Sequence, residues 1–180
     1  MNIGFIGLGV MGRPMAGHLI DAGHHVSLHR VKETSQSLVD KGGKALDSAR
    51  AVAEASDVII LMLPDTPDVE AVLFGADGVA EGLSAGKLVI DMSSIAPVAT
   101  KDFARRINAL GADYLDAPVS GGELGAKNAA LTIMVGGEQA VFDKALPLLQ
   151  TMGKTITLVG GNGDGQTAKV ANQIIVGLTI

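Results

Sequence analysis

The first thirty residues of this chain place a glycine-rich turn directly between an apolar run and a helical pattern. The apolar run covers residues 2–6, glycines follow at positions 7, 9 and 12, and the helical pattern continues to about residue 22. A strand, a Gly-x-Gly-x-x-Gly turn and a helix in this order are typical of a dinucleotide-binding unit. The first glycine permits the tight turn, the second lets a pyrophosphate approach the backbone, and the third lets the helix pack on the strand. A purely structural turn is the alternative, because the chain contains 24 glycines in 180 residues. The residues expected to contact the cofactor are Gly7, Leu8, Gly9, Val10, Met11 and Gly12.

Short apolar runs alternate with longer helical patterns along the rest of the chain. The runs that we expect to form strands are 3–6, 25–29, 58–63, 88–91, 113–117, 131–135 and 155–159. The expected helices cover 12–22, 34–41, 49–55, 68–73, 97–110, 139–151 and 165 onward. Alternation of this kind indicates βαβ crossovers. We therefore predict an α/β fold with a Rossmann-type, doubly wound, mainly parallel sheet and helices on both of its faces.

The composition agrees with this fold and excludes several classes of function. Hydrophobic residues make up 47% of the chain and aromatic residues only 3%, which suits a parallel sheet covered by helices. The net charge of −5 argues against a nucleic-acid partner. The chain has no cysteine, so disulfides, thiolate catalysis and cysteine-bound zinc are excluded. The sequence has no signal-peptide pattern and no apolar run of membrane length, so we expect a cytoplasmic protein without a membrane partner.

The end of the second expected strand should contact the ribose of the cofactor. An acidic residue there binds a free 2′-hydroxyl, whereas an arginine favours a 2′-phosphate, to which its planar fork donates two hydrogen bonds. Arg30 and Lys32 occupy this stretch, and the first acidic residue, Glu33, lies beyond it. The pattern favours NADP(H) over NAD(H), with a solvated basic turn as the structural alternative.

Two further strand ends carry residues that we expect near the cofactor. In a doubly wound sheet, ligands lie beyond the carboxyl ends of the strands, near the switch in strand order. Leu63 and Pro64 end the third expected strand, and the following loop reaches Asp68. Ser94 follows the fourth expected strand, where its hydroxyl can meet the ribose or the nicotinamide. Taken alone, either loop is also compatible with an ordinary turn.

The loop at residues 116–122 combines a strand end, a hydroxyl group and two glycines, and a short helix can follow it. Such a loop can present the Ser120 hydroxyl and free backbone N–H groups of Gly121 and Gly122 to an anion. A small carboxylate is the natural ligand for this arrangement, so we expect a substrate that carries one.

The last expected helix brings a lysine and two amides onto one face. Lys169, Asn172 and Gln173 have the spacing i, i+3 and i+4, and their neighbours are apolar. Burial lowers the pKa of a lysine toward the working range of a proton donor. The structural alternative is a solvated lysine. His18 and His24 are interpreted as structural or surface groups, because no acidic cluster accompanies them, and no metal site is expected.

The same helix stays apolar on most faces, and no capping glycine or terminal charge closes the pattern. We expect either further chain or another subunit to cover this helix, and a homo-oligomer is the expected result. In the 180 residues alone, we expect self-association through the helix, fraying of the helix, or packing in a different position. The apolar side chains concerned are Ile174, Ile175, Val176, Leu178 and Ile180.

Four motifs in the same order resemble those of the β-hydroxyacid dehydrogenase family, over essentially the whole chain. They are the glycine-rich turn at 4–12, Leu63-Pro64 with Ser94, the loop at 116–122, and the run 165–172 around Lys169. The runs 91–95 and 160–166 are most similar to members that reduce tartronate semialdehyde. The 6-phosphogluconate dehydrogenases of the superfamily carry a histidine at the position of Asn172, which argues against that activity. Many relatives have a second asparagine at Gln173.

The resemblance implies an NAD(P)H-dependent reduction of a small carboxylate-bearing aldehyde, with Lys169 as the general acid. It further implies that Ser120, Gly121 and Gly122 hold the carboxylate and that Asn172 orients a substrate oxygen. The family has a second, all-helical domain that closes the site and forms most of the dimer interface. We therefore expect residues 1–162 to form the NAD(P)-binding domain and 163–180 the start of an interdomain helix, with little activity in these 180 residues alone. Succinic semialdehyde, glyoxylate or 3-hydroxyisobutyrate as substrate, and a dinucleotide-binding module without turnover, remain the alternatives.

Overall fold

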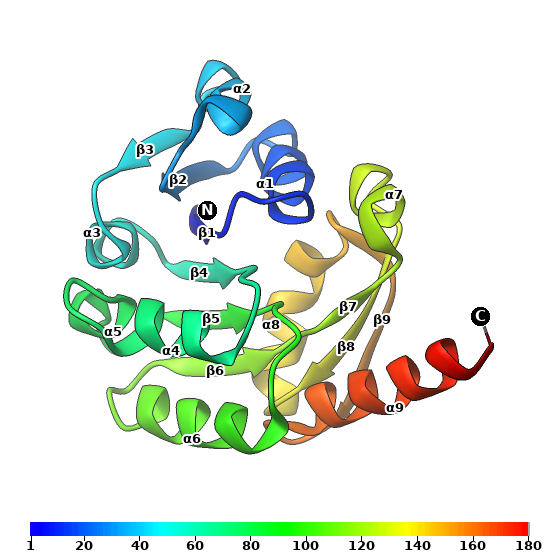
Figure 1. Cartoon of the computed structure of the whole chain (residues 1–180). Coiled ribbons are helices and arrows are strands. Elements are labelled where there is room, and N and C mark those ends of the chain that lie inside the picture. The colour runs from blue at the N-terminus through cyan, green and yellow to red at the C-terminus, as the bar shows by residue number, and fades with distance from the viewer. Residues whose placement is uncertain (180) are drawn as a thin grey trace.

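A single mixed sheet with helices on both faces organises the chain (Figure 1). The structure is a computed structural model that describes residues 1–179. Its strands are β1 Asn2–Ile6, β2 His25–His29, β3 Lys44–Leu46, β4 Val58–Leu61, β5 Leu88–Asp91, β6 Asp113–Asp116, β7 Val119–Ser120, β8 Leu131–Gly136 and β9 Gly153–Gly160. Its helices are α1 Gly12–Asp21, α2 Gln36–Asp40, α3 Ala49–Glu54, α4 Thr66–Phe74, α5 Val79–Gly82, α6 Pro97–Asn108, α7 Gly122–Lys127, α8 Gln139–Leu149 and α9 Asp164–Thr179, with a short 3₁₀ turn at Glu33–Ser35.

The strand order confirms the predicted Rossmann-type fold. Six strands are parallel in the order β3-β2-β1-β4-β5-β6. The chain adds β2 and β3 on one side of β1, and it then adds β4, β5 and β6 on the other side. Beyond β6, β8 is antiparallel to β6 and β7, and β9 runs parallel to β8 at the edge. The switch in strand order lies between β1 and β4, where such sheets bind ligands beyond their carboxyl ends.

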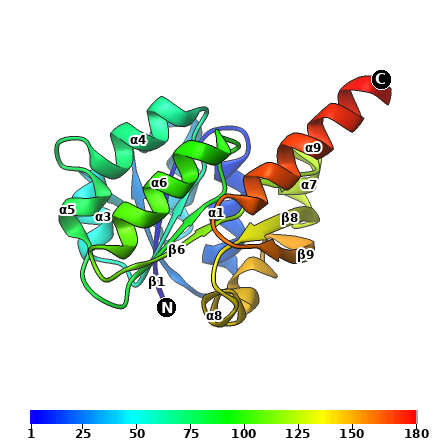
Figure 2. The same cartoon turned by 90° about the horizontal axis from the view of Figure 1, so that it is seen from below.

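The strands are apolar on both faces because helices cover both. Successive residues of β1 alternate between two hydrophobic clusters: Ile3 and Phe5 face one cluster, and Ile6 faces the other. The first cluster includes side chains of α1, α2, α7 and α8, and the second includes side chains of α3, α4, α5 and α6. Figure 2 shows these helix layers on either side of the sheet. Burial on both faces explains why the strands read as continuous apolar runs.

Three elements were not predicted: β3, β7 and α5. They have three, two and four residues, which is too short for a periodic apolar pattern to be recognised. Helix α4 also begins at Thr66, earlier than expected, because Asp65 caps it by accepting a hydrogen bond of 2.7 Å from the Thr66 N–H. The third expected strand ends at Leu61, so Met62 and Leu63 belong to the loop that follows.

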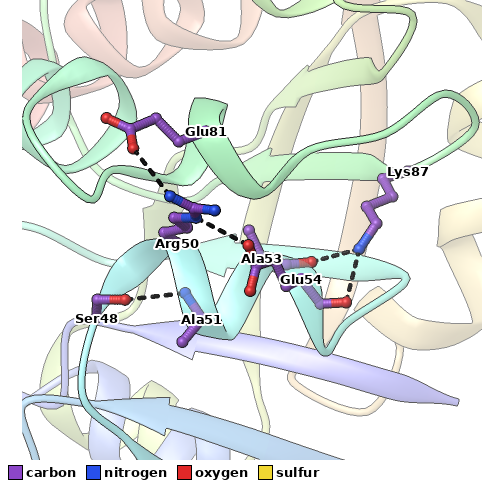
Figure 3. A network of polar contacts seen from close by, with 7 residues as sticks. All are labelled: Ser48, Arg50, Ala51, Ala53, Glu54, Glu81 and Lys87. Atoms are coloured by element: carbon purple, nitrogen blue, oxygen red, sulfur yellow. Dashed lines mark hydrogen bonds and ion pairs between the residues drawn. The ribbon is translucent and has the colours of Figure 1, made fainter.

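A polar network joins α3 to α5 and to the residue that precedes β5 (Figure 3). Arg50 bonds Glu54 within α3 and reaches Glu81 on α5, and Ser48 caps α3 by accepting from the Ala51 N–H. Lys87 donates to two carbonyl groups at the end of α3. The two Lys87 bonds lie at the amino end of β5, so they support the sheet at the side opposite the carboxyl ends of its parallel strands.

Helix α9 is buried where it begins and exposed where it ends. Its first turns pack against β8, β9 and α6, and Figure 2 shows the later turns leaving the body of the molecule. Ile174 is 59% exposed and Leu178 is 82% exposed, whereas Ile180 lies outside the described residues. No helix among the described residues is long and apolar enough to cross a membrane.

We expect the exposed end of α9 to mediate self-association of the 180-residue chain. Complete burial of a large apolar side chain contributes about 1.5–3 kcal/mol, so covering Ile174 and Leu178 is favourable. Sedimentation should detect association that the double substitution Ile174→Glu, Leu178→Glu weakens, whereas Val98→Glu, at an equally exposed residue of α6, should not. A parent chain that stays monomeric at every concentration, with α9 helical, would contradict this expectation.

Candidate cofactor and substrate site

A cleft of about 460 Å³ lies at the switch in strand order. The carboxyl ends of β1, β2 and β4 form its floor and walls, because the chain leaves the sheet at each of these points. Its lining residues are Ile6, Gly7, Leu8, Gly9, Val10, Met11, Gly12, His29, Arg30, Lys32, Thr34, Met62, Leu63 and Pro64. The structure thus brings together the glycine-rich turn, Arg30 and the Leu63-Pro64 pair. Asp68 is the third residue of α4 and Ser94 follows β5, and neither lines this cleft.

Close backbone contacts explain the spacing of the glycines in the turn. Gly7 has a φ of +106°, and a Cβ there would collide with the Met62 carbonyl group. A Cβ on Gly12 would collide with the Gly7 carbonyl oxygen and lie 3.0 Å from the Phe5 ring. Gly9 has open space around it, so its backbone is accessible from the cleft. The turn therefore leaves room above the start of α1, where helix N–H groups favour a phosphate.

The rim of the cleft near β2 is basic and fixed in shape. Arg30 has a φ of +57°, a left-handed conformation that is uncommon for a residue other than glycine. The Ser35 hydroxyl accepts from the Lys32 N–H at 2.9 Å and donates to the Lys32 carbonyl at 3.1 Å. The Arg13 guanidinium donates to the Thr34 carbonyl at 2.7 Å, which ties this loop to α1. Sequence reasoning missed Arg13 and Thr34, because neither position belongs to a recognisable motif.

A second cleft, of about 500 Å³, shares the loop after β4 with the first. Leu63 and Pro64 line the first cleft, and the next two residues, Asp65 and Thr66, line the second. Its other lining residues are Ser94, Ile95, Ala96, Pro97, Gln166, Lys169, Val170, Gln173 and Ile174. The structure therefore groups Ser94 with Lys169 and Gln173 rather than with the glycine-rich turn.

Lys169 is buried on the first turns of α9. Its Nζ donates to Gln173 Oε1 at 2.8 Å, along the i, i+4 face that the spacing predicted. Burial lowers the pKa of the Lys169 ammonium, because desolvation disfavours the charged form. A proton donor with a lowered pKa gives up its proton more readily near neutral pH.

The ends of β5 and β6 carry two buried carboxyl groups, those of Asp91 and Asp116. Asp91 accepts hydrogen bonds from the Ser93 N–H at 3.0 Å and the Tyr114 hydroxyl at 3.1 Å. Burial raises the pKa of Asp91 to about 6 and also raises the pKa of Asp116. The Ser93 hydroxyl accepts from the Leu63 N–H at 2.9 Å, so the loop after β5 is bonded to the loop that lines the first cleft. Sequence reasoning did not assign roles to Asp91 or Tyr114, because their partners come from distant parts of the chain.

The residues of the expected substrate loop line neither of the two clefts. Ser120 belongs to β7 and pairs with Thr132, while Gly121 and Gly122 have φ values of +130° and +59°. None of these three residues lines the second cleft, and Asn172 does not line it either. The Asn172 Nδ2 is nevertheless buried without a hydrogen-bond partner within residues 1–179, so an amide donor is available there.

Two of the four histidines lie within hydrogen-bond distance of backbone carbonyl groups. His18 Nε2 lies 2.9 Å from the Ala126 carbonyl and His29 Nδ1 lies 3.3 Å from the Leu46 carbonyl. Burial lowers the pKa of His24. Within the described part of the chain, no three histidine or acidic residues are grouped as metal ligands would be.

Comparison with known proteins assigns the family. The model of the NAD binding domain of 6-phosphogluconate dehydrogenase matches residues 2–161. The chain belongs to this family. Residues 2–161 therefore form an NAD-binding domain, and the first cleft lies within them.

The relatives confirm the resemblance to β-hydroxyacid dehydrogenases. The chain is 57% identical to 2-hydroxy-3-oxopropionate reductase of Escherichia coli (strain K12), over all of its own length and 62% of that protein. The structure of Mycobacterium tuberculosis 3-hydroxyisobutyrate dehydrogenase with L-serine has a TM-score of 0.90 at 36% identity, over 97% of this chain and 59% of that one. Psf3 in complex with NADP⁺ and 2-OPP has a TM-score of 0.89 at 31% identity, over 94% of this chain and 61% of that one. The chain thus spans about three fifths of the length of these relatives.

The contact between Lys169 and Gln173 predicts how the pKa of the lysine can be shifted. The Gln173 amide oxygen accepts a hydrogen bond from the Lys169 ammonium and so favours its charged form. Gln173→Leu removes this acceptor and should lower the pKa of Lys169 further. Gln173→Glu should raise this pKa, because it places an anion beside the ammonium. Asp65 is the acidic residue that lines the same cleft, and it is present in both variants, so it does not account for a difference between them. An NMR titration of the Lys169 side chain measures these shifts, and Gln150→Leu at the end of α8 is the matched control. Identical lysine titrations in both Gln173 variants and the parent would contradict the prediction.

Proposed function

We propose that the protein uses NADPH to reduce tartronate semialdehyde (2-hydroxy-3-oxopropanoate) to glycerate. The observation that carries this proposal is the buried Lys169, which lines a cleft that shares the loop after β4 with the first cleft. A lysine in that place has a lowered pKa and no carboxylate bonded to its Nζ among the described residues. The name of the E. coli relative supports the choice of substrate.

The first cleft fits a nicotinamide dinucleotide in shape and in charge. The accessible backbone at Gly9 and the start of α1 would hold the pyrophosphate, and Arg30 and Lys32 would hold a phosphate on the ribose. Leu63 and Pro64 would contact the part of the nucleotide nearest the second cleft, and Ser94 would contact it from that cleft. Asp68, in the first turn of α4, would approach the nucleotide from the same loop. When bound, the cofactor supplies the hydride that is added to the aldehyde carbon.

The residues of this chain would handle the oxygen atoms of the substrate. As the aldehyde becomes an alkoxide, the Lys169 Nζ would transfer a proton to that oxygen and become neutral. Ser120, with the N–H groups of Gly121 and Gly122, would bind the carboxylate, and Asn172 Nδ2 would donate to a substrate oxygen. The unpaired donor of Asn172 supports this role, because a buried N–H group without a partner is costly.

Two alternatives follow from the same site. The relatives include 3-hydroxyisobutyrate dehydrogenases, so another small semialdehyde or 3-hydroxy acid is the second candidate substrate class. A dinucleotide-binding module without turnover is the third, and the buried Lys169 argues against it, because such a module needs no proton donor. Comparison of kcat/KM for tartronate semialdehyde, succinic semialdehyde, glyoxylate and 3-hydroxyisobutyrate, in a coupled absorbance assay, distinguishes the three.

We further propose the organisation of the protein that the relatives suggest. Residues 1–162 would form the nucleotide-binding domain and 163–180 the start of a helix leading to a second domain, since the relatives are longer than this chain. The 180 residues alone would have little activity, because the second cleft is open to water. A cytoplasmic homo-oligomer is the expected form.

Replacement of Arg30 should separate the two cofactors. Charge-assisted hydrogen bonds to a phosphate contribute about 1.5–3 kcal/mol, so Arg30→Ala should weaken NADPH binding by roughly 10- to 100-fold. NADH affinity should change by less than about threefold, since NADH has no phosphate for Arg30 to bind. Fluorescence titration measures both constants, and Arg105→Ala on α6 is the matched control. A clear preference of the parent protein for NADH would refute the assignment.

Replacement of Lys169 should affect turnover far more than cofactor binding. Loss of a general acid typically lowers kcat by about 10²–10⁴-fold, so Lys169→Ala should show a fall of this size in the protein at its full natural length. The dissociation constant of NADPH should change little, because Lys169 does not line the first cleft. Lys144→Ala, on α8, should leave both quantities unchanged. A Lys169→Ala variant with kcat within a few-fold of the parent would remove this lysine from the mechanism.

A further inference from the structure

One completely buried amide joins two segments that are far apart in the sequence. The Gln166 side chain has no exposed surface, and its Nε2 donates to the Ser93 carbonyl at 2.7 Å. Its Oε1 accepts from the Ile95 N–H at 3.1 Å. A carbonyl can only accept and an N–H can only donate, so these two partners require both halves of an amide. The two bonded residues stand on either side of Ser94, which lines the second cleft.

The backbone around Gln166 is held as firmly as its side chain. Asp116, at the end of β6, accepts from the Gly163 N–H at 2.7 Å and from the Gln166 N–H at 3.0 Å. Gly165 lies so close to the sheet that a Cβ on it would be 2.6 Å from the Met134 carbonyl oxygen and 2.8 Å from Asp116. The start of α9 is thus attached to β6 through Asp116 and to the loop after β5 through Gln166.

These contacts determine where Lys169 stands. Lys169 follows Gln166 by three residues, so the two lie on the same side of α9, separated by a rise of about 4.5 Å. From the other side, the Thr66 hydroxyl oxygen accepts from the Ala96 N–H at 3.1 Å, which fixes the same loop to α4. Gln166 therefore links the helix that carries Lys169 to the loop that carries Ser94 through its side chain.

We propose that Gln166 is a positioning residue for the reaction: its buried amide sets the placement of Lys169 relative to the Ser93–Ile95 loop, which lines the second cleft. This inference rests on the proposed function, in which Lys169 transfers a proton beside the cofactor. A displacement of a reacting group by about 1 Å can lower a rate by about 100-fold, so a link of this kind matters more for turnover than for binding.

The chain offers a matched control for a purely structural role. Lys87 also makes two side-chain bonds to backbone carbonyl groups, at Ala53 and Glu54, and it precedes the same strand β5 whose other end leads to Ser93 (Figure 3). Lys87 lines neither of the two clefts. A comparison of Gln166→Met with Lys87→Met therefore separates loss of stability from loss of positioning.

The experiment uses both variants in the protein at its full natural length. Both should lower the melting temperature, whereas only Gln166→Met should lower kcat, by about 10- to 100-fold, with the dissociation constant of NADPH changed by less than about threefold. In the same variant, an NMR titration should show the pKa of Lys169 moving back toward that of an exposed lysine, and the Ile95 amide should exchange faster with solvent. Gln166→Glu keeps the length of the side chain and, while its carboxyl is protonated, can keep both hydrogen bonds. Its loss of kcat should therefore grow as the pH rises and the carboxyl ionises beside the Ser93 carbonyl, and this pH profile serves if the methionine variant does not fold.

The readouts distinguish failure of this inference from failure of the proposed function. Absence of aldehyde reduction by the parent would reject the proposed function, and the Lys169 titration would still decide the role of Gln166. A Gln166 variant whose lysine titration and kcat match those of Lys87→Met would overturn the inference and leave Gln166 as a structural amide.

Discussion

The parallel pairing of β1 with β4 is the contact on which both clefts depend. Ile6 lies opposite Leu61 in this pairing, so the turn after β1 meets the loop after β4 immediately beyond the sheet. Only a glycine fits at position 7, because the Met62 carbonyl group occupies the space that a side chain would need. This close contact between Gly7 and Met62 places the glycine-rich turn and the loop after β4 on the same cleft. The same loop continues to Asp65 and Thr66, which line the second cleft.

Polar groups that are costly to bury hold the carboxyl edge of the sheet together. Asp91 and Asp116 are inaccessible to solvent, and burial raises the pKa of each. Their hydrogen bonds with Ser93, Tyr114, Gly163 and Gln166 offset part of the desolvation cost. These bonds hold the loop after β5 and the start of α9 against the sheet, and Ser93 also bonds the loop after β4. Such a site has little freedom to reorganise when a charge develops in it, which is what electrostatic stabilisation requires.

The charge at the rim of the first cleft is opposite in sign to the net charge of the chain. The chain has a net charge of −5, yet the rim of the first cleft near β2 presents Arg30 and Lys32. The loop that carries them is bonded to α1 through Arg13, so these cations stay at the cleft. An acidic protein can therefore still offer a phosphate-binding surface, because Coulomb interactions with a bound ligand are dominated by the nearest groups.

The sequence by itself determined the architecture, the first cleft and the face that carries Lys169. The glycine spacing, the alternation of strands and helices, and the i, i+4 relation to Gln173 depend on residues close together in the chain, where periodicity is readable. Only the tertiary structure decided that Ser94 stands with Lys169 rather than with the glycine-rich turn, and that Asp116 and Gln166 hold α9 in place. The bonds that decide this join residues 50 to 73 positions apart, and each needs the whole sheet to bring its partners together. The short elements β3, β7 and α5 were missed for the same reason, because neighbouring strands and helices stabilise them rather than their own sequence pattern.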